Sequence, residues 1–436
     1  MVTNCTVEQV YRIRPLLQFL KMLPDPRCGR ETKHDLAEVL ACLILGFLAG
    51  RTTIRRSLRW CRNHLKELRK DMRLKHGIAS PSTVSRLLSG IDEQMFLYIF
   101  MEWIGEIVPT KKRHIAVDGK ALRGSGEKVK GTRASMLLNA VDVETGLVLS
   151  QIPILEKTNE ITAIPGLLKM LNLSESVITA DSIGTQTEIM MQIREQGGHF
   201  VFVVKRNQPQ SYEEIKKYMG EAMEDNAARK KGGGQAKIRH PEIMGSYDEY
   251  QKFETNRDRH EYRRCCVTNE ASLLTKAQGE WGFLETVGLL RQVRIPLERD
   301  AEGNDITPDA ETFFKEGSRR KPRPRSGESE HSDIQTVGLL SDKKLNAEEI
   351  LAIKRAHWAV ENKLHHVLDD TFREDRSPAK KSKNNLALIR KFAYNILRLA
   401  MMAEESEKIM TEMMDCFCDD VSLAEKYVFQ EIKSLY

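Results

Sequence analysis

The sequence lacks any apolar run long enough to cross a bilayer. The longest, Leu36 to Gly50, includes Glu38 and is shorter than the roughly 20 residues that a membrane helix needs. No basic-then-apolar segment opens the chain, so we expect no secretory leader. We therefore predict that Leu36 to Gly50 is a buried helix of a cytoplasmic protein that has no membrane contact.

The C-x-x-C pairs of zinc sites and the glycine-rich loop of nucleotide-binding enzymes are also missing. The eight cysteines show no C-x-x-C spacing of the kind that holds zinc, and we expect reduced thiols in a cytosolic compartment. The G-x-x-x-x-G-K-[ST] loop of nucleotide-driven enzymes does not occur. Gly124-Ser125-Gly126 is expected instead to be a flexible connection beside Asp118. We found no internal repeat.

The composition is that of a folded protein with more than one domain. The chain has 436 residues, of which 41% are hydrophobic and 30% charged, so it can bury a sizeable core. Its formal net charge of +6 permits an anionic partner but does not require one. The distribution of the charges along the chain is therefore more informative than their sum.

Residues 1–110 are predicted to form a helical domain that binds DNA. Apolar residues recur there at three- and four-residue spacing. The segment from Arg51 to Lys75 contains ten Lys or Arg residues and only two acidic ones. The following segment, Gly77 to Leu88, is typical of a turn, an N-cap and a second helix. A helix-turn-helix reader and a solvated basic face on a helical bundle both explain this pattern. In the first case we expect DNA contacts from Arg55, Arg56, Arg59, Ser82 and Arg86.

Residues 111–206 change to alternating strands and helices. A short apolar run, Ile115 to Val117, ends in Asp118, and a second run, Ser176 to Ala180, ends in Asp181. This alternation predicts an α/β sheet with both faces covered. The paired strands expected between these two runs are Ser135 to Ala140 and Gly146 to Ile154.

Three further divisions follow along the chain. Residues 207–345 are predicted to be a β-rich insertion with two mobile basic loops, 230–234 and 319–325. Its expected strands are Glu261 to Val267, Glu285 to Leu297 and Ile334 to Leu340. Residues 346–400 are expected to form the final helices of the catalytic core, and residues 401–436 a helical tail.

The two strand-end aspartates suggest a metal site. Functional side chains converge where the strands of an open α/β sheet end, and carboxylates that lie close together repel one another unless a divalent cation neutralises them. Asp-Gly also simply makes turns, so the pattern alone is weak. A third element is the helical segment Ala352 to Asp370. Its residues His357, Glu361, His365 and Asp369 are four apart and form one polar stripe, which is either a solvated face or a ligand face.

Several segments, in order along nearly the whole chain, resemble the ISAs-type, H-repeat-associated family of DDE insertion-sequence transposases. Leu23-Pro-Asp-Pro-Arg27 and the apolar stretch after it are similar to the domain that accompanies this transposase type. The other matching segments are His114-Ile-Ala-Val-Asp-Gly-Lys-Ala-Leu-Arg-Gly-Ser125, Thr179-Ala-Asp-Ser182 with Glu195 to Lys205 and Asn207-Gln208, and Arg355-Ala-His-Trp-Ala-Val-Glu-Asn362 with Leu364-His365, Leu368-Asp369, Phe372 and Glu374-Asp375.

The resemblance implies a fold and a reaction. The expected fold is α/β: a ribonuclease H-like catalytic core with a β-rich insertion, preceded by an all-helical N-terminal domain. Asp118, Asp181 and Glu361 would be the catalytic carboxylates and would bind two Mg²⁺ or Mn²⁺ ions. One ion would activate a water or a 3′-hydroxyl, and the other would stabilise the leaving oxygen of a phosphodiester.

The resemblance also implies the partners. These are double-stranded DNA in the form of terminal inverted repeats and target DNA, and a second copy of the chain, giving a homodimer on DNA in the nucleoid. The residues expected to hold phosphates are Lys120, Arg123, Lys205, Asn207, Lys354, Arg355, His357 and Trp358.

Two alternatives stay open at this point. A domesticated or inactive relative would bind DNA without cutting it. A metal-dependent hydrolase would use the stripe of His357, Glu361 and His365 as ligands, although the spacing differs from the H-E-x-x-H pattern. Intact carboxylates favour an active transposase over the inactive relative.

Overall fold

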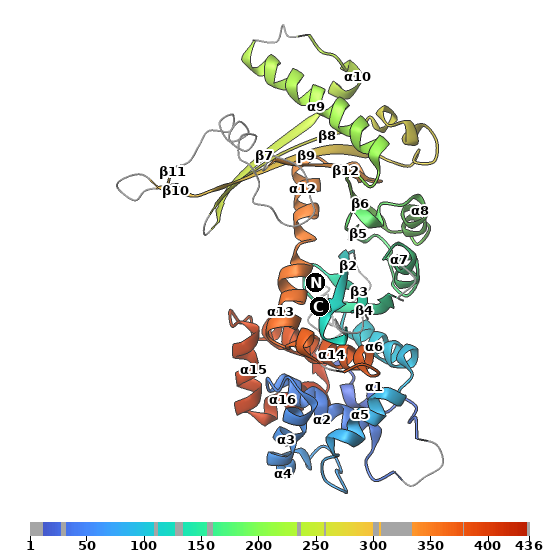
Figure 1. Cartoon of the computed structure of the whole chain (residues 1–436), viewed down its shortest axis with the longest axis vertical. Coiled ribbons are helices and arrows are strands. Elements are labelled where there is room, and N and C mark those ends of the chain that lie inside the picture. The colour runs from blue at the N-terminus through green and yellow to red at the C-terminus, as the bar shows by residue number, and fades with distance from the viewer. Residues whose placement is uncertain are drawn as a thin grey trace, which may run out of the picture. The chain divides into compact units, whose positions relative to one another are not determined.

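The chain folds into two compact units of mixed α/β structure (Figure 1). Unit 1 consists of Met1–Ser174 and Trp358–Tyr436, and unit 2 consists of Glu175–His357. The α/β class predicted from the sequence is confirmed. The computed structural model describes residues 12–27, 32–108, 112–126, 134–154, 160–232, 237–256, 259–299, 305–306, 334–377 and 379–433.

The described N-terminal part of unit 1, up to Val108, consists mainly of helices. Side chains of Asp35, Thr53, Ser80 and Asp92 each accept the backbone N–H of the third helical residue, which fixes where four of the helices begin. The second helix is buried over almost its whole length. The helices are α1 (Leu16–Leu20), α2 (Leu36–Leu48), α3 (Ile54–Asn63), α4 (Leu65–Leu68), α5 (Pro81–Gly90) and α6 (Glu93–Ile107).

Helices from the C-terminal end of the chain pack against the N-terminal ones. Helix α2 contacts α14 (Lys383–Ala403), α15 (Met410–Asp419) and α16 (Val421–Phe429). Strand β1 (Arg12–Ile13) pairs with β13 (Ile432–Lys433). The two ends of the chain therefore share one core, and a separate N-terminal domain stays a prediction, as do the domain boundaries given above.

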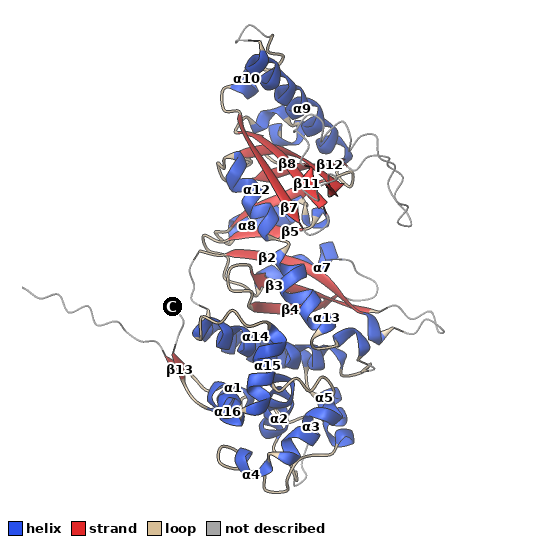
Figure 2. Cartoon of the chain, turned by 90° about the vertical axis from the view of Figure 1, so that its left-hand side faces the viewer, coloured by secondary structure: helices blue, strands red, loops and turns tan. Residues whose placement is uncertain are grey.

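Unit 1 also contains a three-stranded antiparallel sheet in the order β4-β3-β2 (Figure 2). Its strands are β2 (His114–Leu122), β3 (Ser135–Asp142) and β4 (Val148–Ile154), so the predicted strand pair is confirmed. Gly146, at φ 76°, makes the turn between β3 and β4. Helix α7 (Glu160–Lys169) packs on β3 and β4, and α6 packs on β4.

The helical segment that was predicted to run unbroken from Ala352 to Asp370 is interrupted. Helix α12 (Ala347–Ala356) ends before His357, and a π-helical segment, η6 (Val360–His365), leads into α13 (His366–Asp370). The units meet in sequence at the same place, between His357 and Trp358. Residues four apart share one face only in an unbroken α-helix. The prediction that His357 lies in one polar stripe with Glu361, His365 and Asp369 is therefore wrong for His357.

Unit 2 is built on a six-stranded sheet. Strand β5 (Val177–Ala180) is parallel to β6 (His199–Val204), with α8 (Thr187–Glu195) between them in sequence. All other neighbours are antiparallel, in the order β6-β12-β9-β8-β7. These strands are β7 (Asp248–Asn256), β8 (Arg259–Thr268), β9 (Thr286–Pro296) and β12 (Ile334–Ser341).

Two helices cover opposite faces of this sheet. Helix α12 packs its buried residues against Val203, Leu339 and their neighbours on one face. Helix α9 (Pro209–Lys231) lies over the other face, because its Ile215 packs against Gly338, the position next to Leu339 in β12. Both faces of the sheet are therefore covered, as Figure 1 shows for α9 and α12.

The predicted insertion is only partly β-structure. Strands β8, β9 and β12 confirm the three expected strands, whereas the 23-residue helix α9 and strand β7 were not expected. A two-residue pair, β10 (Glu298–Arg299) with β11 (Asp305–Ile306), extends the β-structure. The basic loop 319–325 and residues 233–234 of the first loop lie outside the described residues.

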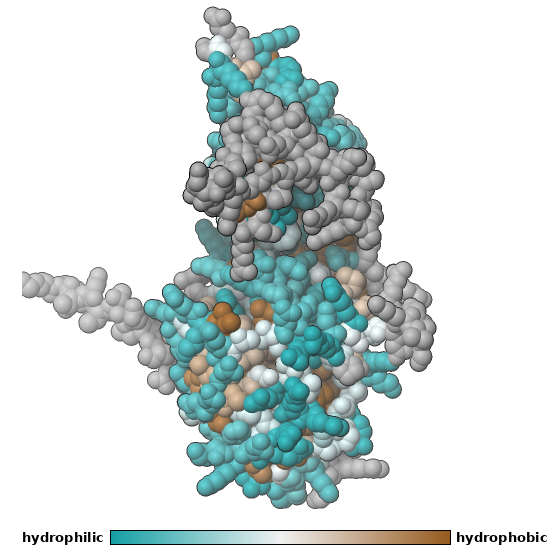
Figure 3. All heavy atoms as spheres, turned by 60° about the vertical axis from the view of Figure 1, so that its left-hand side comes forward, coloured by the Kyte–Doolittle hydropathy of each residue, from teal (hydrophilic) through white to brown (hydrophobic). Residues whose placement is uncertain are grey.

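Among the described helices, none is both long and apolar enough to cross a membrane. Large hydrophobic side chains that are exposed are spread over the chain rather than gathered in one place. Figure 3 shows the described surface of unit 1 on one face as mostly hydrophilic, with small hydrophobic areas between.

Candidate functional site

Asp118 and Glu361, far apart in sequence, lie together in unit 1. Asp118 lies inside β2, so the prediction that this strand ends at Asp118 is wrong: the apolar run stops there, but Gly119 to Leu122 stay paired with β3. Glu361 and His365 lie one turn apart in the π-helical segment η6. The Nδ1 atom of His365 is 3.0 Å from Glu361 Oε2 and 3.6 Å from Asp118 Oδ2. One ligand atom from each of the three residues lies within 4.8 Å of the other two.

The three side chains differ in burial. The side chain of Glu361 is 58% exposed and that of Asp118 is 28% exposed, whereas that of His365 is only 6% exposed. Burial lowers the pKa of His365 to about 4, so the imidazole is neutral at neutral pH. The site therefore consists of two solvent-accessible carboxylates that face a buried, uncharged imidazole.

This donor set fits a divalent cation. Carboxylate oxygens are the ligands that Mg²⁺ and Mn²⁺ prefer, and a neutral imidazole nitrogen binds transition metals. Two carboxylates that share a site also repel each other unless a cation lies between them. Among the described residues of unit 1, Asp118, Glu361 and His365 are thus a group that could hold a metal ion.

Directly beside this site, Lys120 is buried and paired with acids. Side chains two residues apart in a strand share a face, so Lys120 points to the same side of β2 as Asp118. Its ammonium pairs with Asp369 and lies 3.9 Å from Glu374 and 3.8 Å from Asp375. Lys120, predicted to hold a DNA phosphate, is therefore occupied with carboxylates.

The segments that carried the family resemblance in unit 1 pack against each other. The backbone N–H of Arg123 donates to Asp375 Oδ1 at 3.1 Å, while its side chain is 79% exposed. A Cβ on Gly124 would lie 2.5 Å from the backbone oxygen of Asp375, so only glycine allows this approach. A Cβ on Gly119 would lie 2.3 Å from Glu160 Oε1. The Asp-Gly-Lys and Arg-Gly-Ser motifs are thus shaped by their neighbours in space.

Asp181 lies in unit 2, where β5 ends. Its Oδ1 atom accepts the backbone N–H of Ser182 at 2.7 Å and the ammonium of Lys205 at 3.2 Å. Burial alone would raise the pKa of Asp181, but this hydrogen bond and the Lys205 charge outweigh burial and lower it. Asn207 Nδ2 donates to the Ser182 carbonyl at 2.8 Å, which fixes the turn after Asp181.

The end of α12 in unit 2 brings further predicted residues near Asp181. His357 Nδ1 is hydrogen-bonded to Thr179 Oγ1 at 3.0 Å, and burial lowers the pKa of His357 to about 4. Arg355 pairs with Glu254 at 2.7 Å. Trp358, the first residue of unit 1 after the junction, is 53% exposed.

Lys354 lies among cations. Its pKa is lowered to about 8, first by burial and then by the charges of Arg263, Lys205, Arg294 and Arg355. No carboxylate among the described residues forms an ion pair with it. The cations around it are paired with acids, Arg263 and Arg355 with Glu254 and Arg294 with Glu261. Lys354 itself is therefore the group that an anion such as a phosphate could pair with.

The N-terminal basic residues have the exposure that DNA contact requires. Arg55, Arg56 and Arg59 are exposed on α3, and Ser82 and Arg86 are exposed on α5. The two helices contact each other. This arrangement is compatible with either interpretation of the segment, a helix-turn-helix or a solvated basic face.

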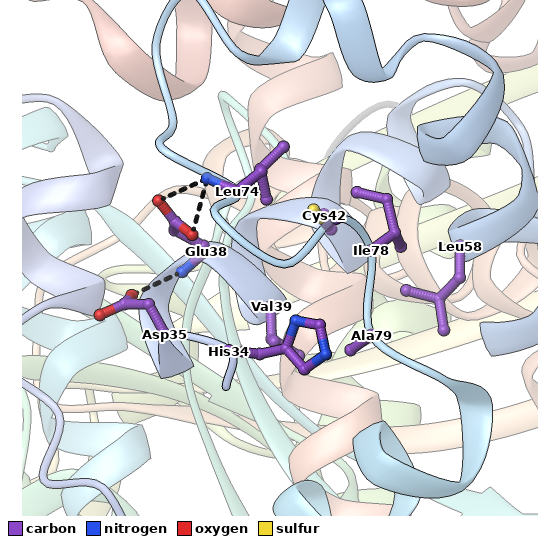
Figure 4. Close-up of a pocket in the computed structure, with 10 residues that line it drawn as sticks. His34, Asp35, Glu38, Val39, Cys42, Leu58, Leu74, Ile78 and Ala79 are labelled. Carbon is purple, nitrogen blue, oxygen red and sulfur yellow. Dashed lines mark hydrogen bonds between the residues drawn. The ribbon is translucent and has the colours of Figure 1, made fainter. Parts of the chain in front are cut away.

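The chain before α5 is held in place by Glu38. Its carboxylate accepts the backbone N–H of Arg73 at 2.7 Å. It also accepts that of Leu74 at 3.2 Å, as Figure 4 shows. Asp35, at the same hollow, caps the N-terminus of α2. Both acids at this hollow are therefore bonded to backbone donors and help to hold the surrounding chain in place.

The fold and the carboxylates indicate a transposase, and comparison with known proteins shows the family. The chain belongs to the family described as Transposase DDE domain, which matches residues 109–396; a second family, DDE_Tnp_1-associated, matches residues 17–104. This family consists of enzymes that cleave and transfer DNA strands with divalent metal ions.

The individual relatives agree with the H-repeat-associated resemblance, which is confirmed. The chain is 28% identical over 392 residues to "Putative transposase YncI" of Escherichia coli O157:H7, covering 88% of each chain. It is 28% identical over 390 residues to "H repeat-associated putative transposase YhhI" of Escherichia coli strain K12, covering 88% of this chain and 90% of the relative. A solved piggyBac transposase synaptic complex with hairpin DNA matches with a TM-score of 0.40 and 12% identity, over 98% of this chain and 82% of that one.

Proposed function

We propose that the protein cuts the DNA ends of an insertion sequence and joins them to target DNA, with Asp118, Asp181 and Glu361 as its catalytic carboxylates. The observation that carries the proposal is the meeting of Asp118 and Glu361 around one potential metal position, from segments 243 residues apart in sequence. Asp181 is included in the proposal because of its Ala-Asp-Ser motif and its position directly after β5. The antiparallel β2, β3 and β4 and the parallel β5 and β6 are the strands expected of a ribonuclease H-like core.

Two divalent ions held by these carboxylates would supply activation of the attacking water or 3′-hydroxyl and charge stabilisation at the leaving oxygen. The protein's own residues set up the reaction. Gly119 donates its backbone N–H to Asp118 Oδ1 at 2.9 Å and thereby orients that carboxylate. Ser182 does the same for Asp181. Lys205, now paired with Asp181, would be released to a phosphate when the carboxylate is neutralised.

We further propose how the chain contacts DNA. The exposed Arg123 and Trp358, and Lys354 with its neighbouring cations, are the best placed of the residues first expected to hold phosphates. Lys120 and Asn207 act within the fold, since their polar atoms are bonded to other residues. The exposed arginines of α3 and α5 would bind terminal inverted repeats, and two copies of the chain would join two DNA ends in the nucleoid.

The test is a cleavage assay on duplex DNA that carries the ends of the element, with and without Mn²⁺. Asp118→Asn, Asp181→Asn and Glu361→Gln should each abolish strand cleavage while binding to the DNA ends persists. Asp370→Asn is the matched control, because Asp370 is an exposed carboxylate on the neighbouring α13 that pairs with His366. It should cleave like the unaltered protein.

Two results would contradict the proposal. Full cleavage by the Asp118 variant would remove that residue from the active site. Binding of the ends by the unaltered protein, with no cleavage under any divalent ion, would favour the alternative of an inactive DNA-binding relative.

A further inference from the structure

Of the two ring nitrogens of His365, only Nδ1 has hydrogen-bond partners among the described residues. Its Nδ1 atom lies at hydrogen-bond distance from Glu361 and is directed at Asp118 as well, at 3.0 and 3.6 Å. Its Nε2 atom is buried and has no hydrogen-bond partner among the described residues. The orientation of the ring therefore depends on what Nδ1 binds.

We propose that His365 is a third protein ligand, through Nδ1, of the divalent ion held by Asp118 and Glu361. The inference rests on the proposed function, because it assumes that these two carboxylates hold the ion. It goes beyond that function in making the site a mixed oxygen and nitrogen site rather than a purely carboxylate one.

The distances suit shared coordination. Two ligand atoms that are each about 2.1 Å from an octahedral ion, at a right angle, lie about 3.0 Å apart. The separation between Nδ1 and Glu361 Oε2 has this value, and that between Nδ1 and Asp118 Oδ2 exceeds it by a few tenths of an ångström. An N–H on Nδ1 would donate mainly to Glu361, the nearer carboxylate, whereas one cation placed between the side chains is within reach of all three groups.

Burial strengthens this assignment. The His365 side chain is 6% exposed, so its ring is held in place by packing with Nδ1 toward the two carboxylates. Without an ion, the proton on Nδ1 donates to Glu361; with an ion, the proton moves to Nε2 and the Nδ1 lone pair is free to bind the cation. The π-helical turn of η6 carries both Glu361 and His365, and such turns often occur at functional sites.

A nitrogen ligand changes which metal the site prefers. Imidazole is a softer donor than carboxylate and favours Mn²⁺ and later transition metals over Mg²⁺. We therefore expect the Mn²⁺-to-Mg²⁺ affinity ratio of this site to fall when His365 is replaced. In His365→Asn the affinity for Mn²⁺ should be lower by about ten-fold or more.

The direct test uses electron spin echo envelope modulation of Mn²⁺ bound to the full chain. Protein with ¹⁵N in its histidines is compared with the unlabelled protein, and a histidine ligand changes the nitrogen modulation. Since the chain has 11 histidines, His365→Asn identifies the one responsible. His357→Asn is the matched control, because His357 Nδ1 is bonded to Thr179. The label-sensitive modulation should vanish in His365→Asn and persist in His357→Asn.

The outcomes separate this inference from the proposed function. If Mn²⁺ binds, weakens with Asp118→Asn, and shows no histidine modulation, the inference is overturned and His365 is only a hydrogen-bond donor to Glu361. If the modulation depends on His357, the inference is likewise overturned. If Asp118→Asn leaves the affinity for Mn²⁺ unchanged, Asp118 does not bind the ion, and the proposed function is contradicted independently of His365. The labelled comparison needs no substitution, so it shows whether any histidine binds the ion even where a variant folds poorly; His365→Gln is a second variant for assigning that histidine.

Discussion

At the scale of single residues, the most consequential change of interpretation concerns Lys120. The sequence places it two residues after Asp118, where a phosphate contact is the natural prediction. The structure buries its ammonium against Asp369 and Glu374. Sequence spacing could not show this, because the acids come about 250 residues later in the chain. A buried lysine with acid partners acts on stability rather than on DNA directly.

We predict that Lys120→Met destabilises the protein by about 3 kcal/mol, because it leaves buried carboxylates without their cation. Urea unfolding would measure the change. Arg123→Met is the control: its side chain is mostly exposed, and we expect a change below about 0.5 kcal/mol. If Lys120→Met kept full stability but lost affinity for DNA, the phosphate contact would be the correct role.

A second prediction at this scale concerns His357 and acid. Burial and the charges of Lys354 and Lys205 lower its pKa to about 4, while Asp181 acts in the opposite direction. The unfolded chain takes up this proton near pH 6.5 and the folded chain only near pH 4. The stabilising effect is therefore complete above pH 6.5 and is lost as the pH falls toward 4.

The measurement compares unaltered protein with His357→Gln by hydrogen exchange on peptides of α12 and β5. Between pH 6.5 and 4.5 the unaltered protein should lose about 1 kcal/mol more stability than the variant. His365, whose pKa is lowered in the same direction, is present in both proteins, so its contribution cancels. Equal losses would show that His357 titrates normally.

At the scale of elements, the sequence predicted strands and buried helices better than it predicted partners. Apolar runs that end in Asp118 and Asp181 located β2 and β5, because an alternating or continuous apolar pattern reports burial directly. Helix α9 was missed although its signal was present: Pro209 begins it, and Tyr212, Ile215 and Met219 share one face.

The candidate site was less predictable than the elements that carry it. A four-residue spacing shows which side chains share a helical face, but not whether that face meets solvent or another segment. His365 and Asp369 therefore could not be distinguished from a solvated stripe. The π-helical turn left no recognised pattern, so the break between His357 and Glu361 could not be predicted either.

The crossing of α2 and α3 yields a prediction about helix packing. A Cβ on Gly46 would lie 2.3 Å from the Cβ of Ser57 and 2.6 Å from its Cα, and a backbone atom cannot simply move aside. Gly46→Ala should therefore destabilise unit 1 by about 2 kcal/mol through overpacking. Gly105→Ala in α6 is the matched control, since nothing lies within 4 Å.

In the control position alanine should instead stabilise the protein by about 0.5 to 1 kcal/mol, because it restricts the unfolded chain and favours the helix. Thermal melting of both variants gives the comparison. A neutral effect of Gly46→Ala would mean that the two helices separate at little cost.

The exposed basic face of α3 and α5 carries another prediction. If Arg59 and Arg86 contact phosphates, replacing both with alanine should lower the slope of log affinity against log salt by about 2, with little change in stability. Lys169→Ala removes an exposed charge from α7 and is the control for general charge effects. An unchanged slope in the double variant would favour the solvated-face interpretation.

At the scale of the whole molecule, the division into two units means that a bound metal ion should stabilise one unit more than the other. Asp118, Glu361 and His365 belong to unit 1, so an ion bound to them stabilises the folded form of that unit. With Mn²⁺ at about 100 times its dissociation constant, the gain is about 2.7 kcal/mol, which corresponds to about 100-fold slower hydrogen exchange where exchange requires opening of the site.

We expect this protection in peptides from β2 and from residues 360–377 of unit 1. Strands β7 and β8 of unit 2 should exchange at their original rates, because none of the three residues lies in that part of the chain. Asp118→Asn should remove the protection of unit 1 while the exchange rates without metal stay similar. Equal protection of β7 and β8, or protection that survives in Asp118→Asn, would place the principal ion elsewhere in the chain.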